Sequence, residues 1–200
     1  MQIQVMSWTR APKQDLAKEP EGVRAAVLRY LSRREYTAAE LRQRLKDRGA
    51  VSADIEAALN YVQERGYQND ARAGESHIRQ RLQYAPRGRA LVSQELKERG
   101  LSFELNAALL DEYYPVKTEL ELLQRLLAKE ARLEQERLEQ ASPEPAPLEE
   151  GPPQFADAQK TRRLRQKMAR RLLAKGFSQS LVMEALNEWL PQNYDEGFMD

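Results

Sequence analysis

Residues 93–110 read SQELKERGLSFELNAALL, a stretch that predicts a helix, a tight turn at Gly100 and a second helix. Leu96 lies four residues before Gly100, and Arg99 lies directly before it. A glycine just past a helix takes the left-handed conformation, and a cation in the last turn complements the helix dipole. Ser102 is a natural N-cap for the helix that follows. The stretch therefore predicts two helices joined by a short turn.

The same pattern recurs around Gly49 and Gly176, each with a cation directly before the glycine. Ser52 and Ser178 are the N-caps that we expect for the helices after these turns, although the first turn is one residue longer. A further helix is predicted before each pair, and no segment alternates apolar and polar residues as a half-buried strand does. The sequence therefore predicts an all-α fold, an elongated array of three tandem three-helix repeats.

The three repeats give the expected domain organisation. We expect a loose segment at 1–20, repeats at 21–66, 67–115 and 116–190, and an acidic tail at 191–200. The third repeat is interrupted at about 132–157 by an acidic insertion rich in proline, a composition typical of flexible linkers.

Composition excludes most catalytic and metal sites. Cysteine is absent and His77 is the single histidine, which leaves no thiolate or multi-histidine metal site. No phosphate-binding, nucleophile-elbow or zinc-protease motif occurs, so we expect neither an enzyme nor a cofactor, and we interpret His77 as either a surface residue or a satisfied structural one. No apolar stretch approaches 18 residues, and residues 1–18 lack the apolar core of a secretory signal. We therefore expect a cytoplasmic protein with no membrane contact.

Charge is strongly segregated, although the net charge is only +1. Residues 160–175 hold eight lysines and arginines and no acid. On a helical wheel, one side of this segment is apolar and predicted to be buried: Leu164, Met168, Leu172 and Leu173. Beside it, five cations fall within an arc of about 100°: Lys160, Arg163, Lys167, Arg170 and Arg171. These cations either pair with the acidic insertion or tail, or bind a polyanion or an acidic protein surface.

A second basic cluster comprises Arg72, Arg79, Arg81, Arg87 and Arg89. Tyr84 lies among these arginines, where it can stack on a base or pack within the protein. A sequence-reading helix-turn-helix is not expected, because the candidate recognition helices at 52–65, 102–113 and 178–190 are acidic and would be repelled by the phosphates that flank the major groove.

Several short motifs resemble those of the RecX family, which regulates the RecA recombinase. RREYTAAEL at 33–41 resembles that family's RREYSxxEL, and GYQNDAR at 66–72 resembles its GYxDDxR. KGFS at 175–178 resembles the final RGFS turn. The resemblance covers about 22–130 and 157–190, with a departure at Ala73, where the family usually has an aromatic residue.

The resemblance implies a non-catalytic modulator that binds along the RecA–DNA filament and usually inhibits its ATPase and strand exchange, in recombinational repair and the SOS response. Many family members also bind single- and double-stranded DNA without sequence preference. The ten cations of the two clusters are then the expected DNA- or filament-binding residues of a monomer. Two alternatives stay open: a sequence-independent DNA-binding helical module with no recombinase partner, and a helical adaptor whose basic face is neutralised within the chain.

Overall fold

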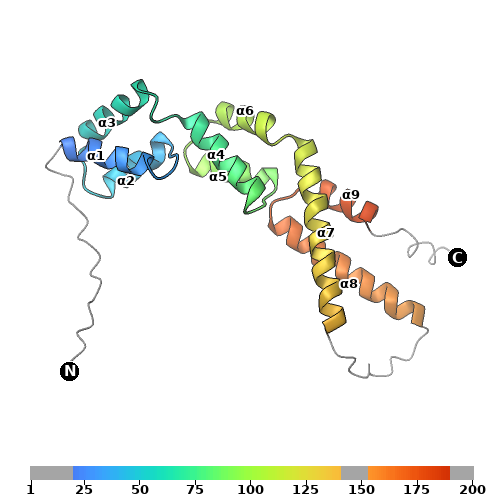
Figure 1. The fold of residues 1–200 in the computed structure, drawn as a ribbon. Coiled ribbons are helices and arrows are strands. Elements are labelled where there is room, and N and C mark those ends of the chain that lie inside the picture. The colour runs from blue at the N-terminus through green and yellow to red at the C-terminus, as the bar shows by residue number, and fades with distance from the viewer. Residues whose placement is uncertain (1–19, 141–152, 190–200) are drawn as a thin grey trace, which may run out of the picture. The chain divides into compact units, whose positions relative to one another are not determined.

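The computed structural model describes residues 20–140 and 153–189, and every regular element in these two ranges is an α-helix (Figure 1). The helices are α1 (Pro20–Leu31), α2 (Ala38–Lys46), α3 (Ser52–Glu64), α4 (Asp70–Gln83), α5 (Arg89–Glu98), α6 (Phe103–Tyr113), α7 (Val116–Gln140), α8 (Pro153–Ala174) and α9 (Gln179–Trp189). The all-α prediction is confirmed for these residues. None of these helices has the combination of length and hydrophobicity needed to cross a membrane.

The described chain forms two compact units. The first contains residues 20–73 and 99–101, and the second contains residues 74–98 and 102–189 apart from the undescribed gap. The division into repeats at 21–66, 67–115 and 116–190 stays a prediction. Of the predicted loose segment at 1–20, residues 1–19 lie outside the described residues, whereas Pro20 begins α1; the predicted tail at 191–200 also lies outside. Of the predicted insertion, residues 141–152 also lie outside, whereas α7 and α8 occupy its two ends.

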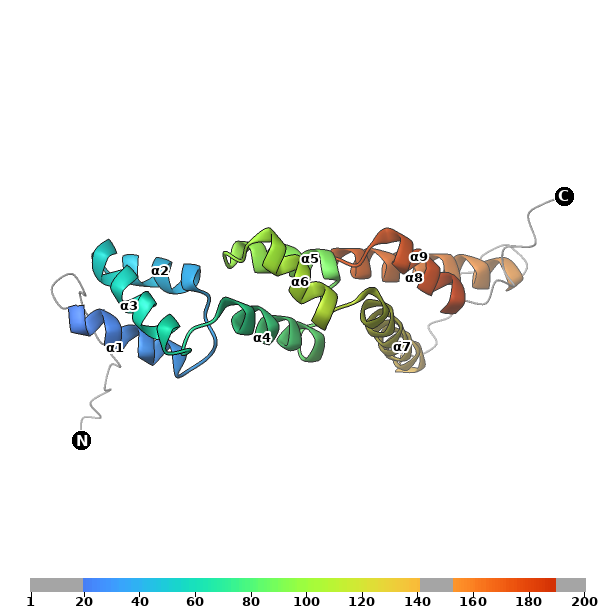
Figure 2. The ribbon, with the colours of Figure 1, turned by 90° about the horizontal axis from the view of Figure 1, so that it is seen from above.

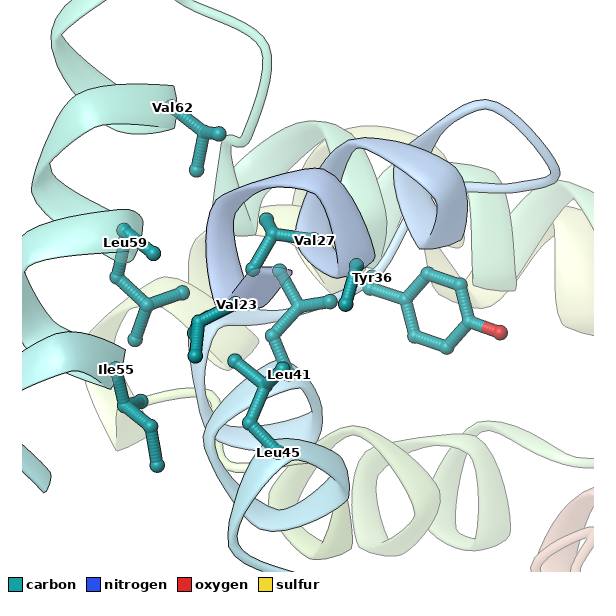
Figure 3. Close-up of a cluster of buried hydrophobic side chains, with 10 residues drawn as sticks. Val23, Val27, Tyr36, Leu41, Leu45, Ile55, Leu59 and Val62 are labelled. Atoms are coloured by element: carbon teal, nitrogen blue, oxygen red, sulfur yellow. The ribbon is translucent and has the colours of Figure 1, made fainter. Parts of the chain in front are cut away.

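Three helices of the first unit, α1, α2 and α3, bury one shared core (Figure 3). Side chains spaced three or four residues apart on each helix point inward, as a helical repeat of 3.6 residues requires. They are Val23 and Val27 on α1, Leu41 and Leu45 on α2, and Ile55, Leu59 and Val62 on α3. Full burial stabilises the fold by about 1.5–3 kcal/mol for each such side chain, so this core is the main reason why the three helices hold together.

Side-chain hydrogen bonds cap the starts of α2, α6 and α9. Thr37 and Glu40 form a reciprocal capping box at α2, with Thr37 Oγ1 3.1 Å from the Glu40 nitrogen and Glu40 Oε2 3.0 Å from the Thr37 nitrogen. Ser102 and Ser178 each accept a bond from the backbone three residues on, as predicted. The prediction for Ser52 is wrong: it is the first residue of α3, and Val51 holds the N-cap position without a side-chain bond. The extra residue in this turn places Ser52 one position too late.

The predicted glycine turns adopt the left-handed conformation, with φ of 79° at Gly49, 85° at Gly100 and 83° at Gly176. Two of them also pack closely on the start of an earlier helix. A Cβ at Gly100 would lie 2.3 Å from the Cβ of Ala39, and one at Gly176 would lie 2.4 Å from the Cβ of Leu91. Glycine is therefore required here both for the backbone conformation and for the close approach.

The second unit brings α5 against α6 and α8 against α9, while α7 packs on both α8 and α9 (Figure 2). Its core again consists of buried aliphatic side chains, such as Leu96, Leu123 and Leu186. The turn before α5 joins this packing, because the backbone nitrogen of Gly88 donates to the Lys175 carbonyl at 2.7 Å. These contacts fix the position of α8 within the second unit, and therefore which of its side chains face the solvent.

Candidate nucleic-acid interface

Helix α8 is held by its apolar side. Met168 and Leu172 are only 2% and 1% exposed, and α8 packs on α7 and α9. Leu164 is half-buried. Leu173 is 42% exposed, so the prediction that it is buried is wrong. It lies about 140° around the helix from Met168 and is turned away from the buried side.

The cations of α8 fall into two groups. Some are exposed and have no partner among the described residues, and the others are ion-paired, half-buried or not described. Arg163 and Arg170 are exposed, and neither has an ion pair or hydrogen bond to another residue of the described chain. Two helical turns separate them, so both point the same way, about 10 Å apart along the axis. Arg162 is likewise exposed and unpaired within the same ranges, although its position in the sequence predicts that it points closer to the apolar side of the helix.

The other cations of the predicted arc have different surroundings. Arg171 forms an ion pair with Glu130 of α7. Lys167 is half-buried. Lys160 belongs to α8, but its side chain lies outside the described part of the chain. The carboxylate that partners Arg171 therefore comes from α7 and not from the acidic insertion or tail.

Three of the five arginines in the second cluster are committed to holding the fold. Arg72, in the first unit, donates to Glu35 at 2.7 Å and to the Gly66 and Tyr67 carbonyls. Arg81 donates to Glu95 at 2.7 Å. Arg89 donates to the Leu110 and Tyr114 carbonyls at 2.9 and 2.6 Å, and pairs with Asp111.

The rest of this cluster is more open. Arg79 is 66% exposed at its side chain, pairs with Glu75 at 2.8 Å and lies over the Tyr113 ring. Tyr84 is exposed as well. Arg87 is half-buried, and its buried Nε has no partner in the described chain. The cluster is thus not one continuous cationic face, and Arg79 is its most accessible charge.

His77 is a satisfied structural residue and not a surface one, which decides between the two interpretations that the sequence allowed. It is 8% exposed, and its Nε2 lies 2.8 Å from Glu95, the carboxylate that also accepts from Arg81. The described residues contain no group of three or more histidines, cysteines or acids that could hold a metal ion.

Paired arginines and tyrosines on the first unit were missed from sequence. The guanidinium of Arg34 lies 3.7 Å from the Tyr36 ring centre, and that of Arg65 lies 3.8 Å from the Tyr61 ring centre. Arg24 lies 4.3 Å from Tyr61 and comes from another helix. A cation over an aromatic face is attracted by the ring quadrupole. Only folding reveals the Arg24 contact, because 37 residues separate it from Tyr61.

Electrostatics in the first unit centre on Glu40. Its burial alone would raise the pKa of the carboxyl, but hydrogen bonds from Arg99, the Thr37 backbone and Arg34 outweigh burial and lower the pKa from its usual value. Glu40 is therefore ionised at neutral pH, and it ties the start of α2 to Arg99 at 2.9 Å.

Comparisons with known proteins agree with these features. Residues 24–61 match the family model for the first three-helix domain of RecX. The chain is 41% identical over 80 residues to the regulatory protein RecX of Legionella pneumophila, covering 40% of this chain and 53% of that protein. It is 39% identical over 74 residues to the regulatory protein RecX of Vibrio parahaemolyticus, covering 37% and 47%. The chain spans about half the length of the curated relatives it matches.

Two solved structures share the fold. The crystal structure of RecX from Lactobacillus salivarius aligns with a TM-score of 0.63 at 22% identity, covering 86% of this chain and 97% of that one. A second crystal structure of a regulatory protein RecX aligns with a TM-score of 0.61 at 20% identity, covering 83% and 72%. Both comparisons support the helical fold described above.

Proposed function

Because this chain belongs to the RecX family of regulatory proteins, we propose that it modulates RecA by binding the RecA–DNA filament and inhibiting ATP hydrolysis and strand exchange. Its action is non-catalytic, through binding alone. The observation that carries the proposal on this chain is the set of exposed arginines on α8 that have no partner among the described residues: Arg162, Arg163 and Arg170.

A helical segment that carries several cations and no acid, as residues 162–174 of α8 do, is suited to an anionic partner. Like charges on neighbouring turns repel by a few tenths of a kcal/mol for each pair. A phosphate backbone or an acidic protein surface relieves this repulsion, and the counterions released from nucleic acid add a salt-dependent driving force. The proposed basic face of α8 also includes Lys160, Lys167 and Arg171. Arg79 is proposed to make a second contact with the same anionic partner.

The binding is proposed to be independent of DNA sequence. The third helices of the predicted repeats, α3, α6 and α9, are acidic or lack cations along most of their length. Such helices are repelled by the phosphates on either side of a DNA groove, whereas arginines on α8 can contact phosphates without reading bases. Weak contacts made by several helices of one chain add through effective concentration.

Fluorescence anisotropy of labelled single-stranded DNA, bare and RecA-coated, tests the proposal at two salt concentrations. Tighter binding to the coated strand is the expected result. Equal, salt-sensitive binding to both strands would favour the second candidate, a DNA-binding helical module without a recombinase partner, which the same arginines also fit. Absence of binding to either strand would reject both functions.

The double variant Arg163→Ala/Arg170→Ala tests whether α8 carries the interaction. It is expected to weaken binding and to lower the dependence of log K on log salt by about 0.7 for each phosphate of a single strand that the variant leaves unneutralised. Arg132→Ala is the matched control, because Arg132 is also an exposed helical arginine but pairs with Glu136 at 2.9 Å. Equal reductions of affinity in the two variants would show that the exposed arginines of α8 do not carry the interaction.

A further inference from the structure

Two of the three predicted turn glycines lie against the start of another helix, and the turn at Gly100 shows the contacts in full. The Thr37 hydroxyl, at the N-cap of α2, donates to the Arg99 carbonyl at 2.6 Å. Glu40, three residues after this N-cap, lies 2.9 Å from the Arg99 guanidinium. Between them, Ala39 lies where a Cβ at Gly100 would come within 2.3 Å of it. The capping box of α2 therefore also binds the residue before the glycine, through its carbonyl and its charge.

The turn at Gly176 repeats part of this arrangement in the second unit. The Gly88 nitrogen, directly before α5, donates to the Lys175 carbonyl at 2.7 Å. A Cβ at Gly88 would lie 2.1 Å from the Gly176 carbonyl oxygen, so the two backbones are in direct contact. In both turns, the carbonyl that precedes the glycine accepts a hydrogen bond from the residue directly before a helix.

The turn at Gly49 has the same backbone conformation and the same preceding cation, but it has no such partner in the described chain. The Arg48 carbonyl accepts no hydrogen bond from a described residue, and the Arg48 guanidinium has no carboxylate within ion-pair distance among these residues. Its one hydrogen bond there goes to the Tyr30 hydroxyl, a neutral group, at 3.4 Å. Both groups that Arg99 uses are thus available on Arg48.

The apolar residues that follow the glycines differ in the same way. Leu101 and Phe177, directly after the two bound glycines, are only 6% and 3% exposed. After Gly49, where the turn is one residue longer, Val51 is 52% exposed. Apolar surface is therefore left uncovered close to Arg48 in the sequence, whereas the corresponding side chains of the other two turns are buried.

Charge at this turn favours a helix N-terminus that carries an acid. Residues 44–51 hold three cations and one acid, Asp47, which accepts from Gln43 at 2.8 Å. Asp54, in the first turn of α3, forms no ion pair with Arg48. The last carbonyls of α2 carry the partial negative charge of a helix C-terminus, and the first nitrogens of a helix carry a partial positive charge. A helix start with a glutamate therefore complements the carbonyl and the guanidinium of Arg48 together.

We propose that the turn at Gly49 binds the N-terminus of a helix from a protein partner, one that begins with the capping-box pattern Thr/Ser-x-x-Glu. The hydroxyl of its N-cap donates to the Arg48 carbonyl, and its glutamate pairs with the Arg48 guanidinium. A small residue between them faces Gly49, and Val51 packs against the partner. The polar contacts are those that α2 makes with Arg99.

The partner is another protein and not a second copy of this chain. Among the helix starts that the structure describes, only that of α2 has a capping box, and Arg99 occupies it. Ser102 and Ser178 cap α6 and α9, but Leu105 and Leu181 stand where the glutamate is required. The site goes beyond the function proposed above, because it contacts protein through the first unit and does not use the arginines of α8.

A nuclear magnetic resonance titration of the full chain tests the proposal. The probe is an acetylated alanine-rich peptide that starts Thr-Ala-Ala-Glu and is longer than about 15 residues, since shorter helices are marginal in water. Saturable shifts in the backbone amides of residues 48–52 are expected. Absence of such shifts, or shifts at residues 99–101 alone, would overturn the proposal. Shifts of the 48–52 amides on concentrating the protein without peptide would identify a second copy as the occupant and would also overturn it.

Two altered peptides separate the capping-box contacts from simple attraction between charges. A peptide that starts Glu-Ala-Ala-Thr has the same charge but no capping box, and one that starts Thr-Ala-Ala-Gln keeps the box but loses the charge. Each is expected to bind at least about tenfold more weakly, because hydrogen bonds to a charged group are among the strongest. Equal binding of the first altered peptide would refute the proposal.

The variant Arg48→Gln tests the same contact from the side of the protein. It is expected to bind the Thr-Ala-Ala-Glu peptide at least about tenfold more weakly than the wild type does. Arg29→Gln is the matched control, because Arg29 is an exposed arginine of α1 whose side chain has no ion pair in the described chain, and its binding is expected to be unchanged. Equal losses in the two variants would reject the site.

Discussion

Replacing Gly100 by alanine is expected to destabilise the protein through two separate effects. The φ of 85° at Gly100 lies in the left-handed region, which costs an alanine about 1–2 kcal/mol. The new methyl group would also lie 2.3 Å from the Cβ of Ala39, and overpacking of this kind costs about 1–3 kcal/mol. The sum is about 2–5 kcal/mol, a large part of the stability of a typical domain.

Gly66→Ala separates the two effects. Gly66 has a φ of 68°, but a Cβ there would meet no atom within 4 Å. This variant is therefore expected to lose only the conformational part, about 1–2 kcal/mol. The difference between the variants measures the packing of the Gly100 turn on the start of α2.

Urea unfolding followed by circular dichroism at neutral pH measures both variants. With a slope of about 1–3 kcal/mol per molar urea, Gly100→Ala is expected to lower the midpoint by about 1 M or more. Ala39→Gly in the Gly100→Ala background removes the opposing methyl group and should recover part of the stability. A Gly100→Ala variant no less stable than Gly66→Ala would refute this account of the turn.

Three further predictions follow from the core, from Glu40 and from Asn106. Leu45→Ala opens a cavity in the shared core of α1, α2 and α3 and is expected to cost about 2–5 kcal/mol in urea unfolding; a change below about 1 kcal/mol would show that Leu45 is not packed as described. The pKa of Glu40 is lowered in the folded state from 4.5, so its ionised form stabilises the fold above that pH, and this contribution is lost as the pH falls through the lower folded pKa. Unfolding midpoints measured from pH 6 to pH 3 should therefore fall less steeply for Glu40→Gln than for the wild type, and parallel curves would argue against the role of Arg99 and Thr37. Asn106→Leu removes the buried Oδ1 that has no partner in the described chain, but it also removes the two hydrogen bonds from Nδ2 to Ser93. The two effects oppose each other, so the free energy of unfolding is expected to change by less than about 1 kcal/mol, whereas a decrease above about 3 kcal/mol would indicate that Oδ1 is satisfied in the folded protein.

Local chemistry explains what the sequence predicted well. The left-handed glycines, the Thr37–Glu40 capping box and the burial of Met168 and Leu172 depend on residues within one or two helical turns, so spacing alone reveals them. Ser52 and Leu173 show the limits of the same reasoning. One extra residue shifts the cap to Val51, and the angular position of Leu173 outweighs its hydrophobicity.

The binding residues depend on contacts that are distant in sequence. Arg72 meets Glu35 across 37 residues, and Arg171 meets Glu130 across 41, so their charges are engaged in ways that composition does not reveal. Arg163 and Arg170 differ from Arg72 and Arg171 because folding brings no carboxylate of the described chain within ion-pair distance of them. The Gly49 and Gly100 turns differ in the same way, because the structure describes a helix start that donates to the carbonyl before Gly100 and none that donates to the carbonyl before Gly49.

ATP hydrolysis by RecA on single-stranded DNA tests the central claim most directly. The protein is expected to lower the turnover rate in proportion to its concentration, Arg163→Ala/Arg170→Ala to lower it less, and Arg132→Ala to act as the wild type does. Turnover that stays unchanged at saturating wild-type protein would contradict the claim that this chain modulates the recombinase.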